Sequence, residues 1–366
     1  MRIVFDGRWI GRTGIGRYAE ELLNELQKLD TVNHYFVLLL PQTYDTWKPA
    51  AANFEAVRTT YEVYAWQEQF LLGAQISQLK PDLVHFTSFN LPIFYSGRFV
   101  TTIHDLTLVH FKNARGGALK RLIYDIKYWA MRGIMRVVTR RAERIIAPCE
   151  FTKNDILSHY QIPASKVVVT YEAVGSAYDD PKPLPFSLPK KYAMYLGNMY
   201  PYKNIERLIE AFAQTKARKS GAKLILAGRT PYFEDVCKAK AKVLGVADEV
   251  IFAGRVSDSE AATLYQKATL FAFPSLYEGF GLMALEAMAQ GTPVLAANAS
   301  CLPEICGDAA AYCDPLDVAD IAVQLDALFD NDDRRQELIK AGYEHVKLFS
   351  WTKMAQETLA IYKDAS

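Results

Sequence analysis

The sequence predicts an α/β protein of two doubly wound domains, each with a parallel sheet covered by helices on both faces. Short apolar runs alternate with helical patterns from one end of the chain to the other. The chain has 366 residues, the length of about two ordinary domains. Four prolines within residues 181–189 interrupt the alternation near its middle. Together these observations predict two similar halves.

The first domain is predicted to span residues 1–178. Short buried strands are expected at residues 3–5, 35–40, 83–86, 99–103, 144–147 and 167–169. Helices are expected where apolar residues recur at helical spacing, at residues 18–29, 66–79 and 119–141.

Residues 179–189 are predicted to form an extended linker, because proline prevents regular structure. The second domain is predicted to span residues 190–350. Its strands are expected at residues 192–196, 223–227, 250–252, 270–273 and 293–296. A last helix is expected at residues 351–363. We expect the two domains to face a cleft, with ligands at the carboxyl ends of the strands.

Composition excludes several classes of protein. The formal net charge is +1, so a general nucleic-acid-binding role is not expected. Five cysteines at irregular spacing argue against a disulfide framework, and Cys301, Cys306 and Cys313 lack the paired spacing of a zinc site. We find no signal-peptide pattern and no apolar run of the roughly 20 residues that a membrane span needs. A cytoplasmic location is therefore expected.

The most informative segment combines a strand, a glycine loop and a helix. An apolar run at residues 269–274 predicts a buried strand, and residues 282–290 predict a helix that stops at Gly291. Between them lies a loop with two glycines. Unpaired N–H groups and the positive end of the helix dipole then converge on one spot, which is the pattern of a phosphate cradle. Carboxylates repel phosphate, so Glu278 and Glu286 indicate the hydroxyls of a sugar and of a ribose.

This segment also resembles a known family. From Pro274 to Val294 it reads Pro-Ser-x-Tyr-Glu-Gly-Phe-Gly-Leu-x-x-x-Glu-Ala-Met-Ala-x-Gly-x-Pro-Val. The run is similar to the signature of the retaining nucleotide-sugar glycosyltransferases of family 4, which have the GT-B fold. The alternative is a helix of a parallel sheet with solvated Glu residues. The resemblance covers nearly the whole chain, most strongly residues 192–314, and implies that the last helix, residues 351–366, crosses back to the first domain.

The resemblance implies that Glu278 binds the sugar hydroxyls and that Glu286 binds the ribose. It also implies a cradle for the sugar and the phosphate around the backbone of Gly279, Phe280, Gly281 and Leu282.

Residues 192–204 predict a strand, a turn at Gly197 and a helix start with Lys203, which is a pattern of anion sites. The resemblance implies that Lys203 binds the donor diphosphate, with Gly197 and Asn198 beside it. Many relatives carry an arginine just after the glycine or just before the lysine, where this chain has Asn198 and Tyr202.

The second phosphate-binding cation is therefore left open. Arg229 and Arg255 are candidates, because each follows a predicted strand and a glycine. Each is equally well read as a solvated surface arginine.

Gly14 and Gly16 fit the dinucleotide-binding pattern Gly-x-Gly-x-x-Ala. Two details argue against a nicotinamide site. Several residues separate Gly14 from the strand that ends near Asp6, and the strand at residues 35–40 ends without the acidic residue that binds a ribose. The resemblance implies instead that both glycines face the diphosphate and the acceptor. A plain helix start is the alternative.

His104 and Asp105 close the strand at residues 99–103. The resemblance implies that His104 contacts the donor sugar near its hydroxymethyl group; a structural histidine is the alternative. In this family the leaving diphosphate is thought to accept the proton, so no general base is assigned, and Asp105 is a weak candidate for one. His85 is expected to be a satisfied core histidine.

The resemblance implies transfer of a sugar from a nucleotide diphosphate to a hydroxyl, with retention at the anomeric carbon. Glu278, His104 and Lys203 are the expected catalytic residues. The sequence has no Asp-x-Asp motif, and neither a metal nor a cofactor is expected. The segment at residues 192–204 and the Glu loop look most like bacterial mannosyltransferases of surface polysaccharide synthesis. GDP-mannose is therefore the expected donor, and a glycan on a lipid carrier the expected acceptor.

Other readings stay open. A UDP-sugar such as UDP-glucose is the second choice of donor. A GT-B phosphorylase or a nucleotide-sugar epimerase is disfavoured by the paired Glu residues with their long flanks. A dinucleotide-dependent dehydrogenase and a non-catalytic nucleotide-binding protein are the alternatives from other classes.

Residues 112–144 hold ten Lys or Arg residues against two acids. Apolar residues recur at helical spacing at Leu119, Leu122, Ile123, Ile126, Ala130, Ile134, Val137 and Val138. A second face carries Arg132, Arg136, Arg140 and Arg144. Such a helix is suited to lie on anionic lipid at the inner face of the cell membrane, as a peripheral contact. A core helix with a basic solvated face is the alternative.

Overall fold

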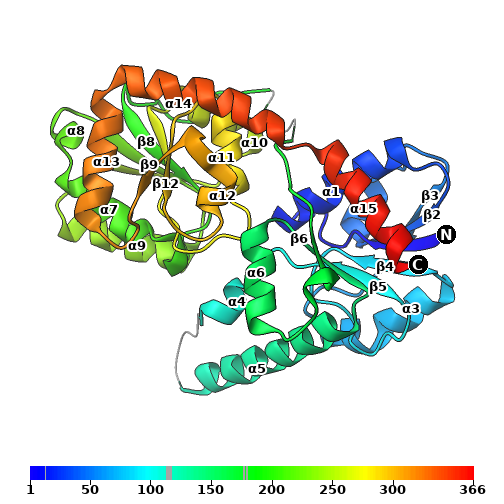
Figure 1. Ribbon diagram of the computed structural model, residues 1–366. Helices are drawn as coiled ribbons and strands as arrows, with labels where there is room; N and C mark the ends of the chain where they lie inside the picture. Colours follow the sequence, from blue (N-terminus) through cyan, green and yellow to red (C-terminus); the bar gives the residue numbers. More distant parts are fainter. Residues whose placement is uncertain (13, 113–117, 176–177, 179) are drawn as a thin grey trace. The chain divides into compact units, whose positions relative to one another are not determined.

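The structure is a computed structural model that describes residues 1–366 except residue 13, residues 113–117, residues 176 and 177, and residue 179 (Figure 1). The chain divides into two compact units. One unit contains Met1–Glu172 together with Ser350–Ser366, and the other contains Ala173–Phe349. Each unit has one sheet in which all described strand pairs are parallel.

The sheet of the first unit has seven strands in the order β3-β2-β1-β4-β5-β6-β7. They are β1 Arg2–Asp6, β2 His34–Leu39, β3 Phe54–Arg58, β4 Leu83–Phe86, β5 Phe99–Thr102, β6 Arg144–Ala147 and β7 Val167–Val169. The direction in which successive strands are added reverses at β1 and β4, which pair with each other. In doubly wound sheets ligands bind beyond the strand ends at such a switch point.

Helices cover both faces of this sheet (Figure 1). They are α1 Gly14–Leu29, α2 Pro41–Thr46, the π-helix η1 Glu68–Leu72, α3 Gly73–Gln78, α4 Thr107–His110, α5 Ala118–Arg141, α6 Glu150–His159, the 3-10 helix η2 Ala164–Lys166, and α15 Trp351–Ala365.

The C-terminal helix α15 is part of the first unit. Ser350 caps it, because its side chain accepts a hydrogen bond from the backbone N–H of Lys353. Thr352 then donates to Glu25 of α1 at 2.7 Å, and the hydroxyl of Tyr362 lies 2.6 Å from Nδ1 of His85 on β4. The chain therefore leaves the first unit after Glu172 and returns to it at Ser350.

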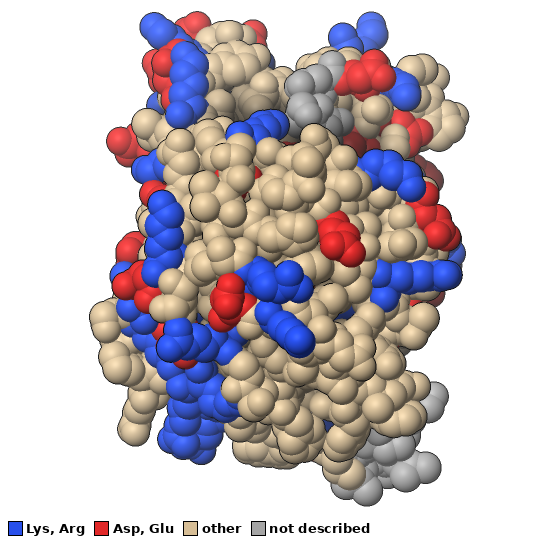
Figure 2. All heavy atoms as spheres, turned by 90° about the vertical axis from the view of Figure 1, so that its right-hand side faces the viewer, with Lys and Arg blue, Asp and Glu red and all other residues tan. Residues whose placement is uncertain are grey.

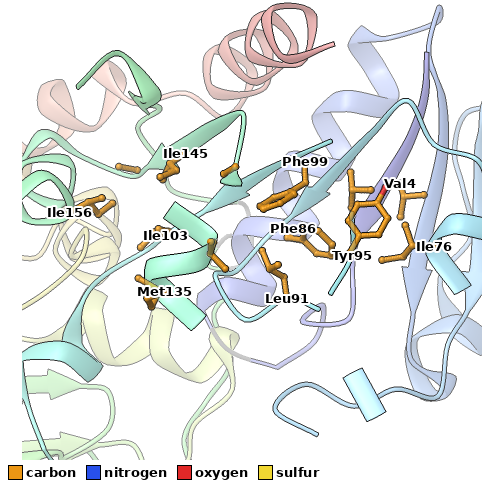
Figure 3. Packing of buried hydrophobic residues seen from close by; sticks show 14 of the residues in the cluster. Val4, Ile76, Phe86, Leu91, Tyr95, Phe99, Ile103, Met135, Ile145 and Ile156 are labelled. Atoms are coloured by element: carbon orange, nitrogen blue, oxygen red, sulfur yellow. The ribbon is translucent and has the colours of Figure 1, made fainter. Parts of the chain in front are cut away.

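The core of the first unit lies between the sheet and its helices (Figure 3). Phe86 of β4 and Phe99 of β5 pack edge to face with ring centres 5.7 Å apart, and Tyr95 packs against Phe86. Met135 of α5 and Ile156 of α6 close the cluster. Apolar residues on adjacent parallel strands form this core because both faces of the sheet are covered.

The sheet of the second unit has six strands in the order β10-β9-β8-β11-β12-β13, with the switch point between β8 and β11. They are β8 Tyr192–Leu196, β9 Lys223–Ala227, β10 Val250–Gly254, β11 Leu270–Phe273, β12 Val294–Ala297 and β13 Ala310–Cys313.

The helices of the second unit also cover both faces of its sheet (Figure 1). They are α7 Ile205–Gln214, α8 Lys216–Lys219, α9 Pro231–Val243, α10 Asp258–Lys267, α11 Leu282–Ala289, α12 Leu302–Cys306, α13 Val318–Asp330 and α14 Asp332–His345, with the 3-10 helices η4 Pro201–Lys203, η5 Gly307–Ala309 and η6 Val346–Leu348. Local sequence explains several starts: Ser257 and Glu260 form a capping box on α10, and Asp317 caps α13.

Three details differ from the sequence analysis. The edge strands β3 and β13 were not predicted, and the expected helix at residues 66–79 is a π-helix followed by α3. The unit boundary lies after Glu172 rather than after residue 178. Past that boundary the chain already packs on the second unit, since Tyr178 contacts the ring of Tyr265 and the backbone of Lys182 bonds to α10 through Ser259 and Thr263.

The surface carries both signs of charge, as the net charge of +1 implies. Figure 2 shows basic and acidic side chains side by side over much of one face, a gathering of basic side chains at lower left, and a broad uncharged area beside it. Among the helices described, none is both long and apolar enough to span a bilayer.

Candidate active site

Three glycines meet at the carboxyl ends of β8, β9 and β10. The backbone N–H of Gly228 donates to the carbonyl of Gly254 at 2.6 Å, and the N–H of Gly197 donates to the carbonyl of Ala227 at 2.9 Å. All three glycines have positive φ. A Cβ on Gly228 would lie 1.9 Å from the carbonyl oxygen of Gly197. The backbone after β9 therefore approaches the backbone after β8 more closely than a side chain at residue 228 would allow.

Replacing Gly228 by Ala is expected to lower the free energy of unfolding by at least about 3 kcal/mol, because the methyl group overlaps the Gly197 carbonyl. Gly245→Ala is the matched control, since Gly245 also has positive φ but nothing lies within 4 Å of its Cβ position. The control should cost about 1 kcal/mol from backbone strain alone. Chemical denaturation measures both, and equal losses would mean that the close approach is not tight.

Lys203 and Glu278 form a buried ion pair at the switch point of the second sheet. Lys203 ends η4, after β8, and Glu278 follows β11. The Lys203 ammonium donates to both carboxylate oxygens of Glu278, at 2.6 and 2.7 Å. The two residues are 7% and 8% exposed. Each charge compensates the other, because burying either charge alone would cost several kcal/mol of stability.

Backbone contacts hold the two loops together. The N–H of Leu276 donates to the carbonyl of Tyr202 at 2.8 Å. Asn204 adopts a left-handed conformation at the start of α7, and its side-chain amide donates to the carbonyls of Pro274 and Pro315. The Lys203 loop is therefore fixed against the Glu278 loop independently of the ion pair.

On its other side the Glu278 loop is fixed to the loop after β12. The N–H of Glu278 donates to the Ser300 hydroxyl at 3.1 Å, and the thiol of Cys301 donates to the Glu278 carbonyl at 3.3 Å. Ser300 has a positive φ of 52°. Such strain in a non-glycine residue is retained where the surroundings fix a loop, which is frequent at functional sites.

Helix α11 begins immediately after this loop. Gly281, with a φ of 88°, occupies the N-cap position, and no side chain caps the helix. Backbone N–H groups at the start of α11 therefore lie next to Glu278 with the positive end of the helix dipole behind them. Glu286 lies one turn along α11 and is buried. The Phe280 ring packs against Phe349, so Phe280 offers its backbone rather than its ring.

The structure places the remaining second-unit candidates as follows. Asn198 is exposed, and its carbonyl accepts a hydrogen bond from the hydroxyl of Tyr195. Arg229 and Arg255 follow Gly228 and Gly254 directly and are exposed, so both lie at the same sheet edge as the glycine cluster.

In the first unit Gly14 and Gly16 lie inside the first turn of α1 rather than in a loop before it. A Cβ on Gly16 would lie 2.2 Å from the carbonyl oxygen of Trp9. Gly16 therefore lets the first turn of α1 pack on the loop that follows β1, whereas nothing lies within 4 Å of the Cβ position of Gly14.

Both ring nitrogens of His104 lie within hydrogen-bonding distance of other residues of the first unit. Nε2 lies 3.0 Å from the carbonyl oxygen of Thr87, and Nδ1 lies 3.2 Å from a carboxylate oxygen of Glu172. The ring of Tyr18 packs edge-on against it. Both nitrogens face oxygen atoms, so these two contacts fix the orientation of the imidazole ring. Asp105 accepts a hydrogen bond from the N–H of Thr107 at the start of α4.

His85 is a buried histidine with two partners. Its Nε2 lies 2.9 Å from the Thr102 hydroxyl, and its Nδ1 contacts Tyr362. Burial and the nearby His104 lower the pKa of His85 to about 3, so the ring is neutral. Its role is to join β4, β5 and α15.

Sequence reasoning missed a buried triad at the switch point of the first sheet. Arg8 contacts Asp6 at 2.7 Å and Glu68 at 2.8 Å, and all three side chains are buried. Glu68 also accepts a hydrogen bond from Asn90, which follows β4. Burial raises the pKa of Glu68, although Arg8 opposes the shift. In the sequence, the charged residues Asp6 and Arg8 at the end of the first strand could have indicated a buried ion pair. Glu68 could not have been included, because it lies 60 residues after Arg8.

Two family models match the chain. The model of glycosyl transferases group 1 matches residues 178–345, and the model of glycosyltransferase family 4 matches residues 12–176. The chain belongs to the family 4 glycosyltransferases. Both matches agree with the division into two units: one covers β2–β7 of the first sheet, and the other covers all six strands of the second sheet.

Among known glycosyltransferases, the chain is 29% identical to O-antigen chain mannosyltransferase B of Escherichia coli over an alignment of 391 positions. The alignment covers 99% of this chain and all of that protein. It is 30% identical to the serotype-specific mannosyltransferase WbdA of Escherichia coli over 227 residues, 59% of this chain and 28% of WbdA. The Anabaena protein HepE, solved with UDP and glucose, superimposes with a TM-score of 0.75 at 17% identity over 99% of both chains. The fold is GT-B.

Proposed function

We propose that this glycosyltransferase moves mannose from GDP-mannose to a hydroxyl of a glycan or lipid-linked acceptor in polysaccharide synthesis, with retention at the anomeric carbon. The Lys203–Glu278 pair at the switch point of the second sheet carries the proposal. A donor has a sugar joined directly to a phosphate, and it needs a carboxylate for the hydroxyls next to a cation for the phosphate.

The geometry of the pair suits this task. An ammonium group has three donors, and Glu278 occupies two of them. The third remains to bind an oxygen of the diphosphate, while the free lone pairs of Glu278 accept sugar hydroxyls. Lys203 then stabilises the charge that develops on the leaving diphosphate, together with the N–H groups at the start of α11. Glu286, on the same helix, is the proposed ribose ligand.

We propose that Arg229 or Arg255 supplies the second cation of the diphosphate site. They lie next to the glycine cluster, where the absence of side chains would let a ligand approach the backbone closely, and no arginine stands at residues 198 and 202. His104 is the proposed contact of the donor sugar, held in orientation by Glu172 and Thr87. Gly14 and Gly16 are the proposed contacts of the diphosphate and the acceptor at the start of α1, which packs through Gly16 on the loop after β1.

Mannose as the donor sugar rests on the similarity to two mannosyltransferases of Escherichia coli. A UDP-sugar is the second candidate, since HepE, which shares the fold, was solved with UDP and glucose.

Differential scanning fluorimetry with GDP, UDP and NAD separates the classes of function. Under the proposal GDP raises the melting temperature of the wild-type protein, NAD has no effect, and Lys203→Ala removes the response to GDP. A larger response to UDP favours the second donor. Stabilisation by NAD alone would refute a nucleotide-sugar site.

Catalysis is proposed to need no metal ion, because Lys203 and the helix dipole supply the positive charge at the diphosphate. Transfer is therefore expected to keep its rate in EDTA. Initial rates with and without EDTA measure this. Full loss of activity on chelation, restored by Mg²⁺ or Mn²⁺, would contradict the proposal.

The basic helix α5 has a different exposed face from the one expected. Met135 and Val138 pack inward, as does Ala142 just after the helix, whereas Ile126 and Val137 of the expected apolar stripe are exposed. Leu119, Leu122 and Ile123 lie where the structure describes no side chains. The Arg132 side chain is oriented toward Tyr128, because it donates a hydrogen bond to the Tyr128 hydroxyl.

The exposed face of α5 combines apolar and basic side chains at helical spacing. Ile126 and Trp129 are each 62% exposed. Arg136 and Arg140 are exposed on the same helix face as Trp129, and Lys127 is exposed on the other side of Ile126. Tryptophan and basic residues on one helix face favour the boundary of an anionic membrane. We place the protein in the cytoplasm, with α5 as a peripheral contact to the inner face of the cell membrane.

The protein is expected to sediment with anionic liposomes at low salt and to dissociate as salt rises. Replacing Lys127, Arg136 and Arg140 together by Gln should abolish this binding, because each such cation contributes about 1 kcal/mol. The matched control replaces Lys219, Lys242 and Lys267 of the second unit by Gln, which changes the net charge equally. Equal binding to neutral liposomes, or equal loss in the control, would contradict a role for α5.

A further inference from the structure

Three side chains of the first unit that the transfer reaction does not use converge at its surface. His110 is the last residue of α4, and Asp155 and His159 lie four residues apart on α6. Residues at this spacing project from one face of a helix. One ligand atom from each of the three lies within 4.8 Å of the other two.

The distances between these atoms approach those of a metal centre. Nε2 of His110 lies 3.0 and 2.8 Å from the two carboxylate oxygens of Asp155, and Nδ1 of His159 lies 3.2 Å from one of them. Ligands held by bonds of about 2.1 Å at tetrahedral angles lie roughly 3.4 Å apart. A widening of the two His–Asp distances by a few tenths of an ångström therefore reaches this spacing, with the two imidazole nitrogens within 4.8 Å of each other.

We propose that His110, Asp155 and His159 bind a divalent transition-metal ion such as Zn²⁺, Co²⁺ or Ni²⁺. Two imidazoles and one carboxylate favour these ions over Mg²⁺ and Ca²⁺, which prefer oxygen ligands. Water completes the coordination, since both histidines are exposed. The ion replaces the hydrogen bonds that Nδ1 of His159 now makes to Ser158 and to the Asp155 carbonyl.

No comparable group occurs elsewhere in the described part of the chain. Of the four other histidines, His85 and His104 are hydrogen-bonded through both nitrogens. His34 faces a single carboxylate, that of Glu55, and Nε2 of His345 lies 2.7 Å from the carbonyl oxygen of Ile305. All five cysteines are buried, so no surface thiol competes for the metal. Binding of one equivalent is therefore expected.

The ion ties α4 to α6. Helix α4 follows directly from His104 and Asp105, and Asp105 accepts a hydrogen bond from the N–H at its start. A bound metal restrains this connection without touching the reacting atoms. Its role is structural, which is compatible with transfer in EDTA.

The test uses the full chain without a histidine tag, stripped with EDTA and then dialysed. Zn²⁺ is titrated by calorimetry, and Co²⁺ is followed by visible absorption. We expect one equivalent to bind and the melting temperature to rise with Zn²⁺. Affinity should fall at least about tenfold in His110→Gln, Asp155→Asn and His159→Gln, each of which retains a polar side chain.

His34→Gln is the matched control, because it removes an exposed histidine beside a carboxylate and should leave binding unchanged. The proposal is overturned if no saturable equivalent binds, if His110→Gln and His159→Gln bind as the wild type does, or if His34→Gln loses as much affinity. In each case the three side chains form only a surface hydrogen-bond network. Donor binding in the same preparations reports separately on the active site.

Discussion

Glu278→Gln is expected to reduce kcat/KM for sugar transfer by about 10²–10³-fold, equivalent to about 3–4 kcal/mol of transition-state stabilisation. The carboxylate is buried beside the ammonium of Lys203 and beside the start of α11, where a sugar next to a phosphate would lie. The amide keeps the size of the side chain but not its charge, so it accepts sugar hydroxyls less strongly and no longer compensates Lys203. Steady-state kinetics on purified protein measure the loss.

Glu304→Gln is the control for this variant. Glu304 is also a glutamate near the start of a second-unit helix, α12, but it does not contact Lys203. It should retain wild-type turnover. A Glu278→Gln enzyme that works at the wild-type rate would remove Glu278 from the site.

Lys203→Ala is expected to damage both stability and donor binding. Removing one member of a buried ion pair leaves the other charge uncompensated, and such changes cost about 3–5 kcal/mol. The loss of the cation should weaken nucleoside diphosphate binding by at least about tenfold, with little effect on the acceptor. Denaturation and calorimetric titration with GDP measure the two effects.

A double variant separates the two roles of Lys203. In Lys203→Ala with Glu278→Ala no buried charge remains alone, so the loss of stability should be smaller than the sum of the two single losses. Donor binding should not recover. Additive losses of stability would mean that the pair is not a coupled unit, and unchanged affinity for GDP in Lys203→Ala would place the diphosphate elsewhere.

Much of the fold follows from local sequence, and its exceptions have physical reasons. Central strands such as β1 and β9 are buried on both faces and read as apolar runs. Edge strands lack that signal: β3 carries Glu55 and Arg58, and β13 consists largely of small residues. The boundary after Glu172 could not be predicted from the sequence, because it depends on which unit the following residues pack against.

The candidate site residues could be chosen from the sequence by residue type, but their partners could not. A glycine loop, a lysine at a helix start and two Glu residues in one segment indicated the chemistry. The contact between Lys203 and Glu278 joins residues 75 apart, and that between His104 and Glu172 joins residues 68 apart. No spacing rule reports such pairs, because the order of strands in the sheet brings them together. The same holds for Glu68 beside Arg8, and for His110 beside Asp155.

Release of free nucleotide from a panel of nucleotide sugars tests the central claim most directly. The panel contains GDP-mannose, UDP-glucose and UDP-galactose, assayed with the wild-type protein, Glu278→Gln and Lys203→Ala in EDTA. We predict that the wild type releases GDP from GDP-mannose faster than UDP from either UDP-sugar, and that both variants lose this release. Equal release by the wild type and both variants, or no release from any donor, would contradict the account.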